Sequence, residues 1–314
     1  LGRTHELTTL AILDELERSG IRALALKGSV LAREVHGDVG LRSPGDIDIL
    51  VSAGDLAGGI EVLGSMGWTH EAVRSRAAPL PVLHETLSHP SLPRVELHWR
   101  VHWYERRFAA DALAGAERAA PHEPLVMRSA DGLAALILFY ARDGFAGLRM
   151  AADVAAWWDT RCSGLNADQL IEETAVRYCE LGAPLRLGAE LLGSLVGLPT
   201  CLRAHSLRLR VAAQLVSPFA EVTLAEARAK VGLVDLLLAP PHGARAALRR
   251  ERQKVPPGIE RPLTRHDDLA VHLARSGHLL RMLRRWVLAV APPAVRTTRS
   301  AFTTRPDAGE DDRP

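Results

Sequence analysis

Apolar and polar residues follow different periods in different regions of the chain. Apolar residues at helical spacing predict a first helix over residues 4–19, which ends at Gly20. The short apolar runs at 21–26 and 46–51 predict buried strands. Helices are expected between and after these strands, from the Lys27-Gly28-Ser29 segment to Gly37 and from a Ser52 cap to Met66.

The pattern changes after residue 67. Short β-like segments separated by prolines follow, and the clearest is RVELHWRV at residues 94–101, which alternates strictly between polar and apolar side chains. The helical period then returns over residues 130–143, 148–161, 166–181 and 184–197. The chain is therefore predicted to have an α+β fold, in which a small mixed β-sheet flanked by helices precedes a mostly helical C-terminal half.

These changes of period divide the 314 residues into four predicted parts. Residues 1–105 form an α/β core, and residues 106–240 form a helical domain that completes a cleft over the sheet. A basic helical extension over residues 241–292 and a disordered tail over residues 293–314 follow.

Composition narrows the class of protein. Hydrophobic residues make up 47% of the chain, yet no uninterrupted apolar run approaches the roughly 20 residues of a membrane span. We expect a cytoplasmic protein without a membrane span. The three cysteines are odd in number and lack CxxC spacing, which argues against a disulfide framework or a thiolate zinc site.

The net charge of +2 indicates little about partners, but its distribution is uneven. Residues 266–290 can form an amphipathic helix rich in arginine. Such a helix can bind an anionic membrane or a nucleic acid, or it can pack its leucines on the helical half and leave its arginines in solvent. We favour the second interpretation, so nucleic acid is not an expected partner.

The strongest chemical signal is the segment GDIDILV at residues 45–51. Side chains alternate faces in a strand, so Asp46 and Asp48 project together while Ile47 and Ile49 face a core. Two adjacent carboxylates repel each other unless a counter-charge is present, and oxygen ligands suit Mg²⁺. An edge strand with a solvated polar face is the alternative, because Asp-x-Asp is common by chance.

A second signal lies upstream. Gly28 and Ser29 follow a predicted strand and open a helix, a turn that offers backbone N–H groups and a hydroxyl to phosphate oxygens. Lys27 and Arg42 add positive charge nearby. An ordinary capped turn and solvated surface charges are the alternatives.

The alternating segment 94–101 supplies a third carboxylate. Glu96 shares its face with Arg94, His98 and Arg100, and it meets Asp46 and Asp48 if the two strands pair with their polar faces aligned. Phosphoryl transfer with two metal ions requires such a set of carboxylates. We expect this site to be polar and to lie outside the core, so that Asp48→Asn leaves the fold intact.

Together these residues resemble a known family. LKGSVLAREVHGDVGLRSPGDIDILV followed by VELHW is similar to the bacterial family of uncharacterised nucleotidyltransferases, a branch of the DNA polymerase β-like superfamily. The resemblance covers roughly residues 1–240 and is specific in the first hundred. An Arg four residues before an Asp on a helix also belongs to the family pattern, and Arg149 and Asp153 match it. The spacer between Ser29 and Asp46 is longer than in minimal nucleotidyltransferases.

The resemblance implies transfer of a nucleoside monophosphate from an NTP, expected to be ATP, to a hydroxyl or similar acceptor with release of pyrophosphate. Two Mg²⁺ ions, or Mn²⁺ in their place, would be held by Asp46, Asp48 and Glu96. Lys27, Gly28, Ser29 and Arg42 would hold the nucleotide phosphates.

The acceptor remains open: a small molecule such as a sugar or antibiotic, a peptide, or a protein side chain. Candidate substrate contacts are His98, Arg149 and Asp153, although Asp153 can also be an ion-pair partner of Arg149 one turn away. A non-catalytic nucleotide- or partner-binding scaffold and a phosphotransferase with the same metal site are the alternatives. A zinc cluster could be formed by the histidines at 84, 89, 98 and 102, but no further ligand motif frames them. We therefore favour structural or substrate-contact roles for these histidines.

Overall fold

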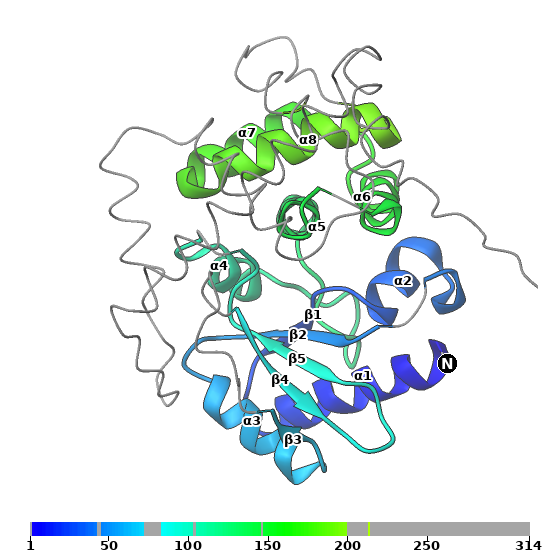
Figure 1. The fold of residues 1–314 in the computed structure, drawn as a ribbon, viewed down its shortest axis with the longest axis vertical. Helices are drawn as coiled ribbons and strands as arrows, with labels where there is room; N and C mark the ends of the chain where they lie inside the picture. Colours follow the sequence, from blue (N-terminus) through cyan, green and yellow to red (C-terminus); the bar gives the residue numbers. More distant parts are fainter. Residues whose placement is uncertain are drawn as a thin grey trace, which may run out of the picture.

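A computed structural model describes residues 2–42, 45–71, 83–102, 105–145, 147–199 and Ala213. Within these residues a mixed sheet lies beside a group of helices, which confirms the predicted α+β fold (Figure 1). The sequence predictions for the basic segment 241–292, the helix at 266–290 and the tail 293–314 lie outside the described residues.

Five strands form one sheet within the described part of the chain, in the order β1-β2-β5-β4-β3. Their bounds are β1 Ala23–Ala25, β2 Ile47–Val51, β3 Thr69–His70, β4 His84–Ser88 and β5 Val95–His98. The central pair, β2 and β5, runs parallel, and the other pairs are antiparallel. The sheet is therefore mixed, as the sequence predicted.

One face of the sheet packs on two helices, α1 Gly2–Arg18 and α3 Leu56–Ser65. The apolar side chains at odd-numbered positions of β2 and β5 form a core with these helices. This core includes Ile12, Leu16, Ile47, Ile49, Leu63 and Leu97. The alternation of the strands thus directs one set of side chains to this core, as period two requires.

The opposite face of the sheet looks toward the helical half of the described chain (Figure 1). The helices there are α4 Phe108–Ala114, α5 Ser129–Arg142, α6 Leu148–Arg161, α7 Ala167–Arg177 and α8 Gly182–Val196. Helix α5 is the central element, and twelve of its residues are buried. Leu24 and Leu50 of the sheet belong to the same apolar cluster as α5, so this core is continuous across the predicted boundary at residue 105. The division into parts stays a prediction.

Close helix packing depends on a small residue in α5. A Cβ atom on Gly132 would lie 2.1 Å from the ring of Trp157, so only glycine allows α6 to approach this closely. Helix α2, Ser29–His36, begins three residues after β1 and contacts α1 and α6. In the described part of the chain, no helix combines the length and apolar character that crossing a bilayer requires.

Candidate functional site

Two carboxylates lie side by side on the face of the sheet that looks toward the helical half. Asp48 of β2 is directly opposite Glu96 of β5, and the two strands are parallel. Paired residues of neighbouring strands project from the same face, so the two side chains share one surface. The strand alternation predicted this common face.

Asp48 is deeply buried, with 2% of its surface exposed. The ammonium Nζ of Lys27 lies 3.1 Å from its Oδ1 atom, and Nε2 of His98 lies 3.1 Å from the same oxygen. Burial alone would raise the pKa of Asp48, but the charge of Lys27 and the hydrogen bond from His98 outweigh it and hold that pKa well below its usual range. The expectation of a site outside the core is therefore wrong: Asp48 is an ionised group inside the protein.

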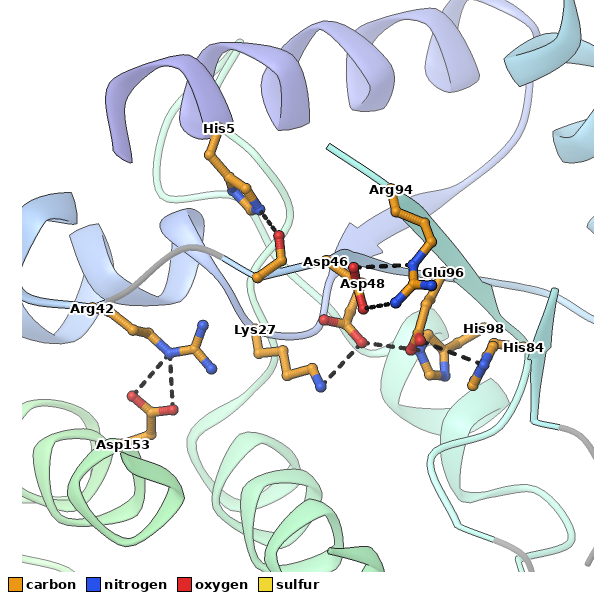
Figure 2. Close-up of polar contacts among 11 residues, drawn as sticks. His5, Lys27, Arg42, Asp46, Asp48, His84, Arg94, Glu96, His98 and Asp153 are labelled. Carbon is orange, nitrogen blue, oxygen red and sulfur yellow. Dashed lines mark hydrogen bonds and ion pairs between the residues drawn. The ribbon is translucent and has the colours of Figure 1, made fainter. Parts of the chain in front are cut away.

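Glu96 is half-buried between two histidines (Figure 2). Nε2 of His98 lies 3.3 Å from Oε2 of Glu96, and Nε2 of His84 on β4 lies 3.6 Å from Oε1. Burial opposes ionisation of Glu96, but the hydrogen bond from His98 lowers its pKa below the ordinary value. Burial and the neighbouring His98 lower the pKa of His84 to about 3. At neutral pH the carboxylate is therefore ionised and His84 is neutral.

Asp46 lies just before β2 and is engaged differently. Both of its carboxylate oxygens accept hydrogen bonds from Arg94, at 3.2 and 3.0 Å. Arg94 is exposed and precedes β5. The structure thus brings Asp48 and Glu96 together and places Asp46 beside them in an ion pair at the more open end of β2 (Figure 2).

The turn between β1 and α2 has a conformation that favours glycine. Gly28 has φ 86° and ψ −145°, a region that side-chain-bearing residues rarely occupy, and it precedes the first residue of α2. Lys27 therefore lies one residue before the N-terminus of that helix, where the first backbone N–H groups have no partner within the helix.

His5 of α1 fixes this turn against the start of β2. Its Nε2 lies 2.9 Å from the carbonyl oxygen of Gly45, and its Nδ1 lies 3.2 Å from Oγ of Ser29. A carbonyl can only accept, so Nε2 carries the proton, and in the neutral ring Nδ1 accepts from the Ser29 hydroxyl. The hydroxyl proton of Ser29 is thereby engaged within the protein.

Asp153 forms its ion pair with Arg42 and not with Arg149, the partner that the sequence suggested. Nε of Arg42 donates to both oxygens of Asp153 on α6, at 3.2 and 3.0 Å, and both side chains are buried. His36 at the end of α2 lies 3.8 Å from the same carboxylate. The predicted partner Arg149 is exposed on α6 instead. Asp153 therefore joins the helical half to the loop before β2, and the terminal nitrogens of Arg42 point away from it (Figure 2).

A further cation from α5 completes the site. The guanidinium of Arg142 lies 4.5 Å from the ring centre of Phe139, and Nζ of Lys27 lies 4.9 Å from the same ring. Nη1 of Arg142 is buried without a hydrogen-bond partner within the described part of the chain. No local pattern marked Arg142 or His5 as a site residue, because each sits in a regular helical pattern and reaches the site through tertiary contacts. For His84 the only signal was its place among the histidines at 84, 89, 98 and 102, which the sequence analysis interpreted as structural or substrate-contact residues.

This arrangement combines the parts that phosphoryl-group chemistry requires: adjacent carboxylates for cations, and a helix N-terminus with positively charged side chains for phosphate oxygens. The carboxylate and histidine ligands of Glu96, His84 and His98 lie within 4.8 Å of one another and can hold a metal ion.

Comparisons with known proteins agree with this geometry. Residues 2–197, more than half of the 314 residues, match a protein family described as "Uncharacterised nucleotidyltransferase". A search of curated proteins gives no match. The family match confirms the resemblance seen in the sequence and supports a transferase activity. The chain belongs to the uncharacterised nucleotidyltransferase family.

Proposed function

We propose that the protein transfers a nucleoside monophosphate from an NTP, with ATP as the expected donor, to a hydroxyl or similar acceptor and releases pyrophosphate. The observation that carries this proposal is the register of β2 and β5, which sets Asp48 opposite Glu96. The glycine turn at the start of α2 lies beside this pair, because Lys27 of that turn contacts Asp48. The family description supports the same reaction class.

The donor atoms of this pair fit Mg²⁺. Carboxylate oxygens are the ligands that Mg²⁺ prefers, and the Lys27 ammonium already marks a position beside Asp48 where positive charge is stabilised. Asp48 and Glu96 would hold the ions, two Mg²⁺ or Mn²⁺ in their place, and Asp46 would join them by releasing Arg94. When bound, such ions neutralise charge on the transferring phosphoryl group and activate the attacking oxygen.

The phosphates would lie along the turn before α2. Backbone N–H groups of Gly28 and Ser29 would donate to phosphate oxygens, while Lys27 and Arg42 supply positive charge. His5 would keep Ser29 in place by its bonds to Ser29 and to Gly45. Because His5 contacts both segments, the loop before β2 and the turn before α2 would hold the phosphates together.

The acceptor would enter between the sheet and the helical half. Glu96 is ionised and half-buried, so it can accept the proton of an acceptor hydroxyl when that hydroxyl attacks the α-phosphorus. His98 would hold Glu96 in position through its Nε2 atom. Arg142 would neutralise charge on the reacting phosphate from the side of α5. Arg149 and Asp153 stay candidate substrate contacts, the first by its exposure on α6 and the second through Arg42.

Mass spectrometry tests the reaction type. The full chain is incubated with Mg²⁺, each of the four NTPs in turn, and a panel of hydroxyl acceptors that includes sugars, aminocyclitol antibiotics and Ser- or Thr-containing peptides. The expected result is one acceptor that gains the mass of a nucleoside monophosphate, with loss of that product in Asp48→Asn and Glu96→Gln. Glu61→Gln, an exposed carboxylate on α3, is the matched control and should keep full activity.

Other outcomes distinguish the alternatives. Addition of a single phosphoryl group would show a phosphotransferase that uses the same site. Nucleotide binding without any modified acceptor across the panel would favour a non-catalytic scaffold of the same fold.

A further inference from the structure

A second set of potential ligands lies beside the carboxylate pair and differs from it in chemistry. His84 on β4 is directly opposite His98 on β5, and Glu96 precedes His98 by two positions on the same face. One ligand atom from each of these three residues lies within 4.8 Å of the other two. Because all three side chains come from hydrogen-bonded neighbouring strands, their backbone positions are fixed relative to one another.

The spacing of these ligand atoms fits a bound cation. Oε2 of Glu96 lies 3.3 Å from Nε2 of His98, and Oε1 lies 3.6 Å from Nε2 of His84. Ligand atoms about 2.0–2.1 Å from a tetrahedral metal ion are about 3.3–3.4 Å apart, close to both of these distances. Side-chain rotations would bring the whole set, which lies within 4.8 Å, around one ion. The carboxylate also faces both rings at once (Figure 2).

The donor atoms favour a different ion from the one expected at Asp48. Two imidazole nitrogens and one carboxylate oxygen are ligands for Mn²⁺, Co²⁺ and Zn²⁺, whereas Mg²⁺ is held by oxygen ligands and water. Nδ1 of each ring is buried and has no hydrogen-bond partner within the described residues. Nε2 is therefore the nitrogen through which each ring meets another polar group: Nε2 of His84 faces Glu96, and Nε2 of His98 faces both Glu96 and Asp48. A bound ion would replace the proton on Nε2 of His98, which is released to solvent.

We propose that His84, Glu96 and His98 bind a divalent transition-metal ion, and that Glu96 is shared between this position and the oxygen-ligand position at Asp48. The two cation positions are thus chemically unequal. Ion binding at the histidine position does not depend on the proposed reaction, so it can be tested without substrate. A histidine–carboxylate hydrogen-bond network without an ion is the competing explanation.

Spectroscopy of bound Co²⁺ and Mn²⁺ tests this site. The full chain is stripped with EDTA, dialysed, and titrated with CoCl₂ while visible d–d absorption is recorded; MnCl₂ binding is followed by pulsed EPR, which detects nitrogen ligands. His84→Ala removes a ligand from a strand position that is partly exposed, and His84→Gln keeps the side-chain volume as a second variant. His36→Ala is the matched control, because His36 lies on α2 and contacts Asp153 instead.

The expected result is about one Co²⁺ per chain with intense d–d bands, and nitrogen coupling to bound Mn²⁺. Both His84 variants should weaken Co²⁺ binding by at least about tenfold, while His36→Ala should not. Thermal unfolding without metal verifies that the variants fold. Absent d–d bands and nitrogen coupling in the wild type would overturn the proposal, and so would unchanged Co²⁺ affinity in a folded His84 variant. If the wild-type chain binds Co²⁺ as expected but modifies no acceptor, the result would count against the proposed function and not against this metal site.

Discussion

The ion pair between Lys27 and Asp48 should be a measurable source of stability as well as part of the candidate site. The two charges are 3.1 Å apart, and only 18% of the Lys27 side chain and 3% of the Asp48 side chain are exposed. The perturbation is a double-mutant cycle made of Lys27→Met, Asp48→Asn and the double variant. The cycle isolates the coupling between the two side chains from their other contacts.

The expected magnitude follows from the distance and the burial. At an effective dielectric constant of about 20, two unit charges at this separation attract by about 5 kcal/mol, which is an upper bound. Desolvation of both groups offsets most of this attraction, so a coupling of about 1–3 kcal/mol is expected. Lys27→Met should be the more destabilising single change, because it leaves Asp48 and Glu96 side by side without the ammonium.

Urea unfolding at pH 7 in EDTA measures each free energy of unfolding. The exposed pair of Arg18 and Glu15 on α1 is a matched control, for which a coupling below about 1 kcal/mol is expected. Additivity of Lys27→Met and Asp48→Asn within about 0.5 kcal/mol would refute the reasoning, because it would show that the two charges do not stabilise each other in the folded chain.

Three further predictions concern neighbouring features. Burial raises the pKa of Glu105 to about 8. The folded chain therefore holds a proton that the unfolded chain releases near its lower pKa, so the stabilising contribution is present at acid pH and is lost as pH rises toward 8. Urea unfolding between pH 5 and 8 should show this fall for the wild type and a flatter profile for Glu105→Gln; equal profiles would contradict it. Asp153→Ala leaves the buried Arg42 guanidinium unpaired and should cost about 3–5 kcal/mol of unfolding free energy, and a loss below about 1 kcal/mol would mean that solvent or another group replaces the pair. Gly28→Ala should cost about 1–3 kcal/mol, because the backbone there has φ 86°, and should weaken binding of a fluorescent ATP analogue in titrations; unchanged stability and binding would show that the turn tolerates a side chain.

The periodicity of the chain was sufficient to predict most elements and the common face of the carboxylates. The helical period predicted α5, α6 and α8 to within two residues at each end, because each presents a continuous apolar face to one core. The prediction of a single helix over 166–181 was too long, because α7 ends at Arg177 and a 3-10 turn occupies Cys179–Leu181. Strict alternation in residues 94–101 placed Glu96 on the face that Asp48 shares. Helix positions and strand faces both depend on local backbone geometry, and for this reason they can be predicted from the sequence.

The contacts that complete the site are long-range and left no local signal. Arg42 and Asp153 are 111 positions apart, and their pairing depends on how α6 packs beside α2. His5 lies 40 positions before Gly45, and Arg142 reaches the sheet from the end of α5.

The burial of Asp48 was predicted wrongly for a related reason. Alternation shows that a polar face exists but not what covers it, and the covering elements come from the helical half.

A crystal structure of the complete chain with Mn²⁺ and a non-hydrolysable ATP analogue tests the central claim most directly. An anomalous scattering peak is expected between the carboxylates of Asp48 and Glu96, with the triphosphate lying along the turn at Gly28 and Ser29. A nucleotide bound elsewhere, or a complex in which the Lys27–Asp48 pair stays closed and no ion contacts either carboxylate, would contradict it.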